Sequence, residues 1–321
     1  MSDPTRSSSP AHQPSRRSLL TAAAALAAGV ALPPFARRAA AIDTGKLLAG
    51  AGRVPPIDIP DSHKISGFAM GCQAYTFNRF TVLEAIEKTA KAGARVIEFY
   101  PGQKVRADQP AVTFGHTSPP AVIEQVKAKL REHDLIAVNY GVVGLPNKAA
   151  DVRKVFEFAK FMNIPAVTSE PQPDALDAIE ACVKEFNVRL CIHDHPKRAN
   201  DPKYMFWNPE WVLDQVRARD PRMGACADVG HWVRSGVKPV DALKVLEGRV
   251  FSSHLKDLNE FGNTKAHDVP YGTGVSGVKD VLDELKRQGF DGNISIEYEY
   301  KQEDNLAEVT KCIDFVKAYK A

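Results

Sequence analysis

The sequence is poor in cysteine, and the cysteines it has are not arranged for cross-linking. Five cysteines occur in 321 residues, an odd number, and no two of them form a CxxC pair. Each one stands in an apolar, periodic segment. These features argue against a disulfide framework and predict buried side chains that behave as small hydrophobic groups. The five are Cys72, Cys182, Cys191, Cys226 and Cys312.

The chain also lacks a strong charge of one sign and a nucleotide-binding motif. The net charge is +3, while residues 1–41 carry five arginines and one aspartate, a net of +4, so the remainder carries about −1. A near-neutral domain does not attract a phosphate backbone, which predicts no nucleic-acid partner. No GxGxxG motif follows the first apolar segment, and the glycines near residues 71 and 141–144 are too sparse to hold a dinucleotide.

No apolar run reaches the roughly 20 residues that a membrane span needs. Arg16 and Arg17 precede an alanine-rich apolar stretch that ends at Leu32, and small residues follow up to Ala41. This order predicts a signal peptide over residues 1–41, which resembles a twin-arginine export signal. We therefore expect a periplasmic protein with no stable membrane anchor after cleavage, and an uncleaved anchor is the alternative. Residues 42–64 are expected to form a linker or an arm over the base of the following domain.

After this arm, apolar runs alternate with amphipathic segments. Eight strand–helix units in about 255 residues predict an α/β fold, a (β/α)8 TIM barrel over residues 65–321, with a doubly wound sheet as the alternative. A capping box is expected at Thr81 and Glu84, and glycine helix ends at Gly93 and Gly289. The expected strands lie near 67–75, 96–100, 135–141, 165–169, 189–193, 223–228, 250–256 and 292–298, and the helices near 81–92, 119–133, 148–162, 173–186, 208–219, 239–247, 277–288 and 303–319.

Four consecutive predicted strands end in residues of the metal-ligand type: His193, Asp228, His254 and Glu297. Because parallel strands of a barrel end at one rim, these side chains should meet over the barrel mouth. Two imidazoles and two carboxylates suit a divalent ion such as Mn²⁺, Zn²⁺ or Co²⁺. For any one of the four alone, the alternative is a strand-end polar group bonded to the backbone.

Five segments follow the pattern of one known family: Val96–Tyr100, Ala227–His231, Ser253–Asp257, Pro270–Gly274 and Ile296–Tyr298. They resemble the xylose isomerase-like TIM barrel superfamily, and most closely its sugar phosphate isomerase/epimerase group. The resemblance implies a metal held by Glu, Asp, His and Glu on the fifth to eighth strands, where this chain has His193 in place of the first glutamate. It also implies that His231 contacts the substrate.

Further polar residues near these strand ends are candidates for the chemistry. A base that removes a proton next to a carbonyl is expected among Glu297, Glu170 and His195. Lys256 is a candidate for holding the developing oxyanion, and its alternative is a rim lysine paired with Asp257.

Two side chains are predicted to contact the substrate besides His231. Glu98 is expected to bond a sugar hydroxyl, or else to bond the backbone at a strand end. Trp232 is expected to offer an apolar face to a sugar ring, or else to belong to the core.

These features predict an exported, divalent-metal-dependent sugar isomerase or epimerase that works through an enediolate of a keto-sugar or related polyol. The replacement of a family glutamate by His193 removes a symmetric acid/base pair, so a lyase or hydratase on 3-oxo glycosides is the main alternative. A non-catalytic sugar-binding barrel is another. An apurinic endonuclease is disfavoured by the charge and the export signal. The expected partner is a small sugar, and the sequence allows a homo-oligomer.

Overall fold

The structure is a computed structural model that describes residue 54 and residues 57–320. The predicted signal peptide falls outside this range, so export and the division into domains remain predictions. Within the described range, none of the helices combines the length and apolar character that crossing a bilayer requires.

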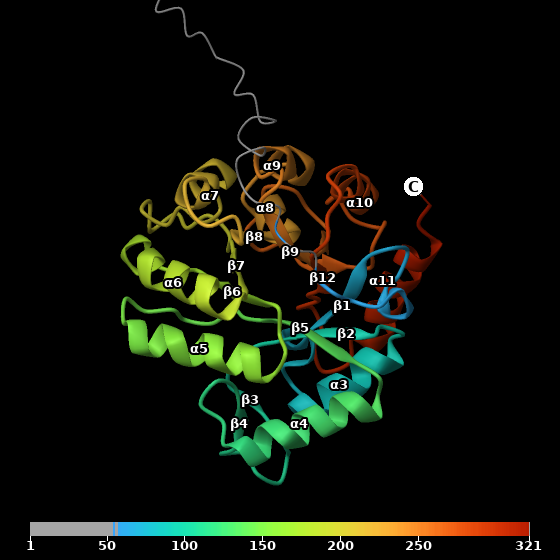
Figure 1. The fold of residues 1–321 in the computed structure, drawn as a ribbon. Helices are drawn as coiled ribbons and strands as arrows, with labels where there is room; N and C mark the ends of the chain where they lie inside the picture. Colours follow the sequence, from blue (N-terminus) through green and yellow to red (C-terminus); the bar gives the residue numbers. More distant parts are fainter. Residues whose placement is uncertain (1–53, 55–56, 321) are drawn as a thin grey trace, which may run out of the picture. The chain divides into compact units, whose positions relative to one another are not determined.

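Eight parallel strands close into a barrel in the order β1-β12-β9-β8-β7-β6-β5-β2, with helices around the outside (Figure 1). This confirms the predicted (β/α)8 fold. The strands coincide with the apolar runs because both faces of a parallel barrel strand are covered, by the interior and by the helices. They are β1 (Ala69–Gln73), β2 (Val96–Phe99), β5 (Ile136–Tyr140), β6 (Ala166–Ser169), β7 (Arg189–Ile192), β8 (Met223–Asp228), β9 (Val250–Leu255) and β12 (Asn293–Ile296).

The helices that link the strands begin and end close to the predicted limits. The capping box is present, since the Thr81 backbone N–H donates to Glu84 Oε2 at 2.8 Å and the Glu84 N–H donates to Thr81 Oγ1 at 3.3 Å. Gly93 and Gly289 have positive φ at the predicted helix ends. The helices are α3 (Val82–Lys91), α4 (Pro120–Glu132), α5 (Ala149–Phe161), α6 (Leu176–Phe186), α7 (Pro209–Val216), α9 (Pro239–Val245), α10 (Val278–Arg287) and α11 (Leu306–Ala318).

The sequence analysis did not predict the short helix α8 (Val229–Arg234), which begins directly after β8. Asp228 is its N-cap, because Oδ1 accepts a hydrogen bond of 2.8 Å from the His231 backbone N–H. One carboxylate oxygen of Asp228 is therefore used by the backbone and the other is left for the barrel mouth. Two small hairpins, β3–β4 (Gln103–Lys104 and Thr113–Phe114) and β10–β11 (Asp257–Leu258 and Asp268–Val269), were also unpredicted.

The loop after β9 is ordered by Asp257. Its carboxylate accepts hydrogen bonds from the backbone N–H groups of Gly272, Gly274 and Ser276, at 2.9, 2.9 and 3.0 Å. A Cβ at position 274 would lie 2.4 Å from Asp257 Oδ1, so only glycine fits there. The chain is thereby folded over the rim beside the ends of β9 and β12.

The opposite end of the barrel carries an apolar cluster beside a partly buried ion pair between Arg189 and Asp291. Ile57 and Ile59, from the described part of the arm, pack against Ala69, Val96 and Val138. All five cysteines are buried and free, which confirms the prediction of small hydrophobic side chains. The polar strand ends and this base divide the barrel into a chemical end and a purely structural end.

Candidate functional site

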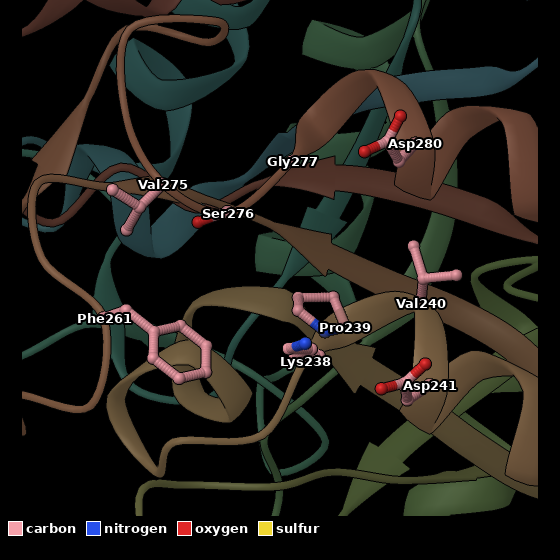
Figure 2. Close-up of a pocket in the computed structure, with 9 residues that line it drawn as sticks. All are labelled: Lys238, Pro239, Val240, Asp241, Phe261, Val275, Ser276, Gly277 and Asp280. Carbon is pink, nitrogen blue, oxygen red and sulfur yellow. The ribbon is translucent and has the colours of Figure 1, made fainter.

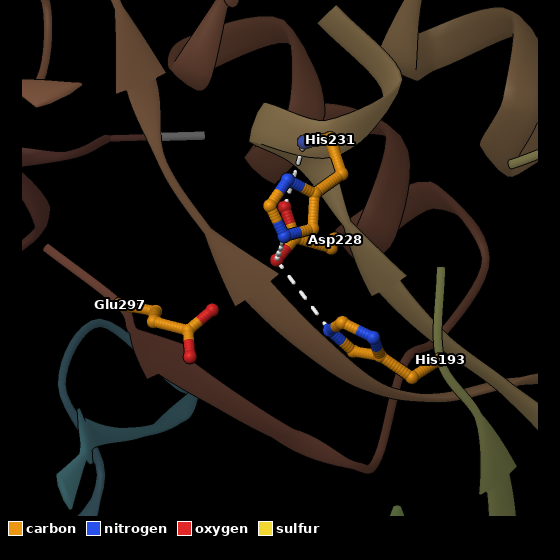
Figure 3. A group of neighbouring side chains, drawn as sticks. All are labelled: His193, Asp228, His231 and Glu297. Carbon is orange, nitrogen blue, oxygen red and sulfur yellow. Dashed lines mark hydrogen bonds and ion pairs between the residues drawn. The ribbon is translucent and has the colours of Figure 1, made fainter. Parts of the chain in front are cut away.

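The four predicted ligands converge at the C-terminal rim of the barrel. Asp228 Oδ2 lies 3.6 Å from His193 Nε2 and 3.7 Å from His254 Nδ1, and His254 Nδ1 lies 3.2 Å from Glu297 Oε2. Figure 3 shows His193, Asp228 and Glu297 pointing toward one another from β7, β8 and the end of β12, with His231 beside them. None of the four ligands is more than 8% exposed.

His193 is held from behind by Glu170, which follows β6. Its Nδ1 lies 3.3 Å from Glu170 Oε1, while Nε2 faces Asp228. A carboxylate accepts hydrogen bonds, so Nδ1 carries a proton and, in the neutral imidazole, Nε2 presents a lone pair. A carboxylate behind a histidine whose other nitrogen faces outward is the arrangement that orients histidine ligands of metals.

His254 is held in the same manner by Glu98 on β2. Its Nε2 lies 3.1 Å from Glu98 Oε1, and its Nδ1 faces Asp228 and Glu297. Glu98 is completely buried, and its other oxygen accepts hydrogen bonds from Ser295 Oγ at 2.6 Å and Asn293 Nδ2 at 3.3 Å. The prediction that Glu98 bonds a sugar hydroxyl is therefore corrected: the side chain has no exposed surface, both its oxygens have protein partners, and it positions His254.

His231 has the opposite arrangement. Its Nδ1 lies 3.0 Å from Arg234 Nη1, and a guanidinium only donates hydrogen bonds. Lys256 Nζ, another group that only donates, lies 3.5 Å from His231 Nε2, so both ring nitrogens face a donor. The shorter contact, with Arg234, favours a lone pair on Nδ1 and the proton on Nε2. Burial holds the pKa of His231 well below its usual range, which keeps the ring neutral. Although His231 Nε2 is close to Asp228 Oδ2, at 3.6 Å, it is a proton donor and not a free ligand atom.

Three buried atoms around this point make no hydrogen bond within the described part of the chain: His193 Nε2, Asp228 Oδ2 and His254 Nδ1. Buried polar atoms are normally satisfied, and these three converge from separate strands. Together with the Glu297 carboxylate they form a nitrogen and oxygen donor set that fits a divalent cation. In the neutral rings, His254 turns a lone pair on Nδ1 toward the other donors, whereas His231 turns its protonated Nε2 toward them. His254 is therefore favoured over His231 as the second imidazole ligand.

Lys256 lies inside the site and is fully buried. Its Nζ is 2.9 Å from Asp228 Oδ2, 2.7 Å from Glu297 Oε2 and 3.0 Å from Glu299 Oε2. The alternative in which it pairs with Asp257 is wrong, because Asp257 is used by the backbone of the neighbouring loop. Lys256 lies two residues after His254, and on an extended strand this spacing turns both side chains to the interior.

The charges of the site stabilise one another against desolvation. Burial opposes ionisation of Asp228 and Glu297, but nearby histidines and Lys256 outweigh it and hold the pKa of both carboxyls below their usual range. Burial likewise opposes the charge of His193, but Asp228 and Glu170 raise its pKa to about 10. A metal ion must therefore displace a proton from His193, so metal binding should release protons.

A second group of side chains lies beside this cluster. His195 Nδ1 is 2.5 Å from Glu170 Oε1, which also accepts a hydrogen bond of 2.7 Å from the Tyr204 hydroxyl. Burial would raise the pKa of Glu170, but His193 and His195 lower it to about 2, so this carboxylate stays ionised. The His195 side chain is 42% exposed and its ring stacks on that of His231, with centroids 5.0 Å apart. His195 is thus an oriented imidazole that solvent can reach.

Trp232 does not face the site. It lies in α8, is 1% exposed and belongs to the main hydrophobic core. A ring that is fully buried cannot stack on a sugar, so the prediction of a substrate-facing tryptophan is corrected in favour of the core alternative. The sequence reasoning could not fix its direction, because it did not predict α8.

Sequence reasoning missed three residues of the site. Glu299 contacts Lys256, and its spacing of two from Glu297 was a usable signal for a shared face. Arg234 contacts His231, and its spacing of three would have shown this had the helix been predicted. Tyr204 lies in the irregular segment between β7 and α7, where no periodic signal exists.

A separate pocket of about 330 Å³ lies between the loop carrying Phe261 and the first residues of α9 and α10 (Figure 2). Lys238, Ser276 and Asp280 are among the residues that line it. None of the four converging ligands and none of their contacting carboxylates belongs to this pocket. The chemistry therefore concentrates at the barrel mouth and not in the pocket of Figure 2.

The family model described as xylose isomerase-like TIM barrel matches residues 86–319. The chain belongs to this family. The finding confirms the resemblance stated from the sequence, and the (β/α)8 fold agrees with it. No curated protein sequence matches the chain.

Solved structures extend this xylose isomerase-like assignment. An uncharacterised protein from Parabacteroides distasonis is 30% identical, with 78% of this chain and 98% of that one covered and a TM-score of 0.63. A D-psicose 3-epimerase from Clostridium cellulolyticum is 11% identical (77% and 98% covered, TM-score 0.57). A probable 3-DHS dehydratase of petrobactin synthesis from Bacillus anthracis is 12% identical (78% and 98%, TM-score 0.56). At such identities the last two show the fold alone.

Proposed function

We propose that this xylose isomerase-like barrel is an exported, divalent-metal-dependent carbohydrate enzyme of the isomerase or epimerase type. The observation that carries the proposal is the pair of carboxylate-backed histidines. His193 and His254 each have one ring nitrogen turned to a carboxylate, partly buried Glu170 and fully buried Glu98, and the other turned, without a hydrogen bond, toward Asp228 Oδ2. The substrate class is inferred from the epimerase and dehydratase folds that the chain resembles.

The donor set supports a choice of ligands and of chemistry. His193, Asp228, His254 and Glu297 would hold the cation, with Glu98 and Glu170 fixing the two imidazoles. A divalent cation there would polarise a sugar carbonyl and stabilise the enediolate formed when the neighbouring carbon loses its proton. Mn²⁺, Zn²⁺ and Co²⁺ all accept such ligands.

The protein's own groups would move the proton. His195 is the best-placed base: Nδ1 is engaged by the ionised Glu170, so Nε2 is the nitrogen that takes a proton, and Glu170 stabilises the resulting imidazolium. Glu297 is the second candidate, although its Oε2 is already 2.7 Å from Lys256 Nζ. His231, with its proton on Nε2, and Lys256 are the groups that would donate to substrate oxygens.

The two candidate bases, His195 and Glu297, differ in exposure and in pairing, and this difference favours a second candidate function. An epimerase needs matched groups on both faces of the carbon, whereas this site offers an exposed imidazole and a buried, ion-paired carboxylate. Once an enediolate exists, loss of the substituent on the next carbon gives a lyase or dehydratase, while return of the proton gives an isomer. A lyase or hydratase on 3-oxo glycosides is therefore the second candidate.

Exchange of substrate protons with solvent deuterium tests both candidate functions. The protein loaded with Mn²⁺ is incubated in D₂O with ketoses and, separately, with 3-oxo glycosides. We expect deuterium at the carbon next to the carbonyl, detected by NMR or mass spectrometry. An isomeric sugar identifies the first function and a released aglycone the second. Binding of these sugars without exchange on either class would contradict both and leave a sugar-binding barrel. Asp228→Asn is the control that should lose exchange.

A further inference from the structure

The ammonium of Lys256 is placed on the same carboxylate oxygens that the proposed cation would use. Asp228 Oδ2 and Glu297 Oε2 are its neighbours at 2.9 and 2.7 Å, and both oxygens also face His254 Nδ1. The side chain of Lys256 is completely buried. A buried charge needs partners, and these carboxylates provide them in the absence of any other cation.

The Lys256 ammonium is also held by Glu299, which is not one of the four proposed ligands. Only its contact with Glu299, at 3.0 Å, has hydrogen-bond geometry to a carboxylate, while the contacts with Asp228 and Glu297 are ion pairs without it. Glu299 is also 31% exposed at its side chain and lies 3.4 Å from Arg234 Nη1. The ammonium therefore has one hydrogen-bonded carboxylate, Glu299, a longer contact of 3.5 Å with His231 Nε2, and two ion-pair partners in the site.

Gly230, in the first turn of α8, leaves space for the side chain of Lys256. A Cβ at Gly230 would lie 2.7 Å from Lys256 Cδ and 2.8 Å from Lys256 Cβ. Such contacts do not occur between real atoms, so an alanine would push the lysine stem aside. Gly230 thereby allows Lys256 to extend beneath α8 to the site.

We infer that Lys256 is the internal counter-ion of the metal-free site, and that a divalent cation must displace its ammonium from Asp228 and Glu297. This inference rests on the proposed metal-dependent function. Two cations on the same two oxygens repel each other, so the ammonium in this position opposes binding of a divalent cation. After displacement the ammonium keeps Glu299 as its partner. The lysine thus offsets the charge of the two carboxylates before metal uptake and sets a threshold for it.

The test is Lys256→Met, which keeps the length of the side chain and removes the charge. Lys129→Met is the matched control, because Lys129 also pairs with two carboxylates, Glu87 and Glu132, but on the outer helices. Mn²⁺ affinity is measured by titration of chelator-stripped protein, followed by electron paramagnetic resonance. We expect Lys256→Met to bind Mn²⁺ at least tenfold more tightly than wild type and Lys129→Met to bind as wild type does.

Thermal unfolding gives a second readout. Metal-free Lys256→Met should unfold at a lower temperature than wild type, because two buried carboxylates lose their cation, and saturating Mn²⁺ should raise its midpoint more than that of wild type. Equal or weaker Mn²⁺ affinity in Lys256→Met would overturn the inference. If the variant does not fold without metal, Gly230→Ala replaces it: tighter Mn²⁺ binding than in Gly144→Ala, where the added Cβ meets nothing, supports displacement, and equal binding overturns it.

These outcomes separate the two proposals. Tighter Mn²⁺ binding by Lys256→Met supports the counter-ion whatever the substrate assay shows. Metal-loaded wild type that exchanges no proton with any carbohydrate contradicts the proposed function alone. Absence of Mn²⁺ binding in wild type and Lys256→Met alike contradicts both.

Discussion

Glu98 provides the sharpest prediction about the site, because it is remote from solvent and acts only through His254. Its Oε1 faces His254 Nε2 at 3.1 Å, and its Oε2 accepts from Ser295 at 2.6 Å and Asn293 at 3.3 Å. Glu98→Gln preserves size and removes the charge. With the amide oxygen toward His254, the new NH₂ meets the NH₂ of Asn293. With the NH₂ toward His254, the proton moves to Nδ1 and the ligand lone pair is lost.

The magnitude follows from this loss. Removing a partner behind a histidine ligand typically weakens metal binding by about 10- to 100-fold, which corresponds to about 1.4–2.8 kcal/mol. We expect a loss of this size in Mn²⁺ affinity for Glu98→Gln. Competition of stripped protein with a fluorescent chelator measures it.

The matched control for this experiment is Glu180→Gln. Glu180 lies on α6 and pairs with Lys184 at 2.6 Å and Arg219 at 3.0 Å, away from the converging ligands. Its substitution removes the same charge and should leave the affinity unchanged. Wild-type affinity in Glu98→Gln would refute the argument that a buried carboxylate prepares His254 for a metal.

Three further predictions follow from the same contacts. His195→Gln should lower the rate of proton exchange by about 10²- to 10⁴-fold and leave the metal content unchanged, since His195 bonds Glu170 and is not one of the four proposed ligands; loss of metal would contradict this and favour the neighbouring group of Glu170, His193 and His195 as the metal site. Trp232→Ala should destabilise the protein by about 3–5 kcal/mol, measured by urea unfolding, whereas Trp232→Phe should leave the KM unchanged; a large rise in KM would place the ring against substrate after all. Burial raises the pKa of Asp268 from 3.8 to about 7, so the folded state keeps a proton that the unfolded chain loses and stability falls as the pH rises through this window. Asp268→Asn should lose less stability than wild type between pH 4 and pH 7 in denaturant titrations, and identical slopes would exclude this residue as the source.

The sequence was sufficient for the barrel because its signals are local and repeated. Apolar runs, Thr81 at a helix start and Gly93 at a helix end each report the conformation of their own neighbourhood. Convergence of His193, Asp228 and His254 followed from the topology, since parallel strands end at one rim.

The depth and direction of individual side chains could not be predicted in this way. The alternation of side chains along β2 predicts that Glu98 points into the barrel. It does not determine whether the carboxylate reaches the barrel mouth or lies beneath it. In the structure Glu98 pairs in register with Asn139 and lies under His254. The direction of Trp232 depended on α8, which forms because Asp228 caps it. The three partners of Lys256 come from β8 and the end of β12, which no local pattern relates.

The central claim is that one divalent cation is bound by His193, Asp228, His254 and Glu297. Crystals of the protein grown with Mn²⁺ and measured at a wavelength where manganese scatters anomalously test it directly. We predict a single strong anomalous peak about 2.0–2.3 Å from His193 Nε2, Asp228 Oδ2, His254 Nδ1 and a Glu297 oxygen, with the ammonium of Lys256 no longer on Asp228. No peak at saturating Mn²⁺, or a peak beside Lys256 that leaves both imidazoles uncoordinated, would contradict the account.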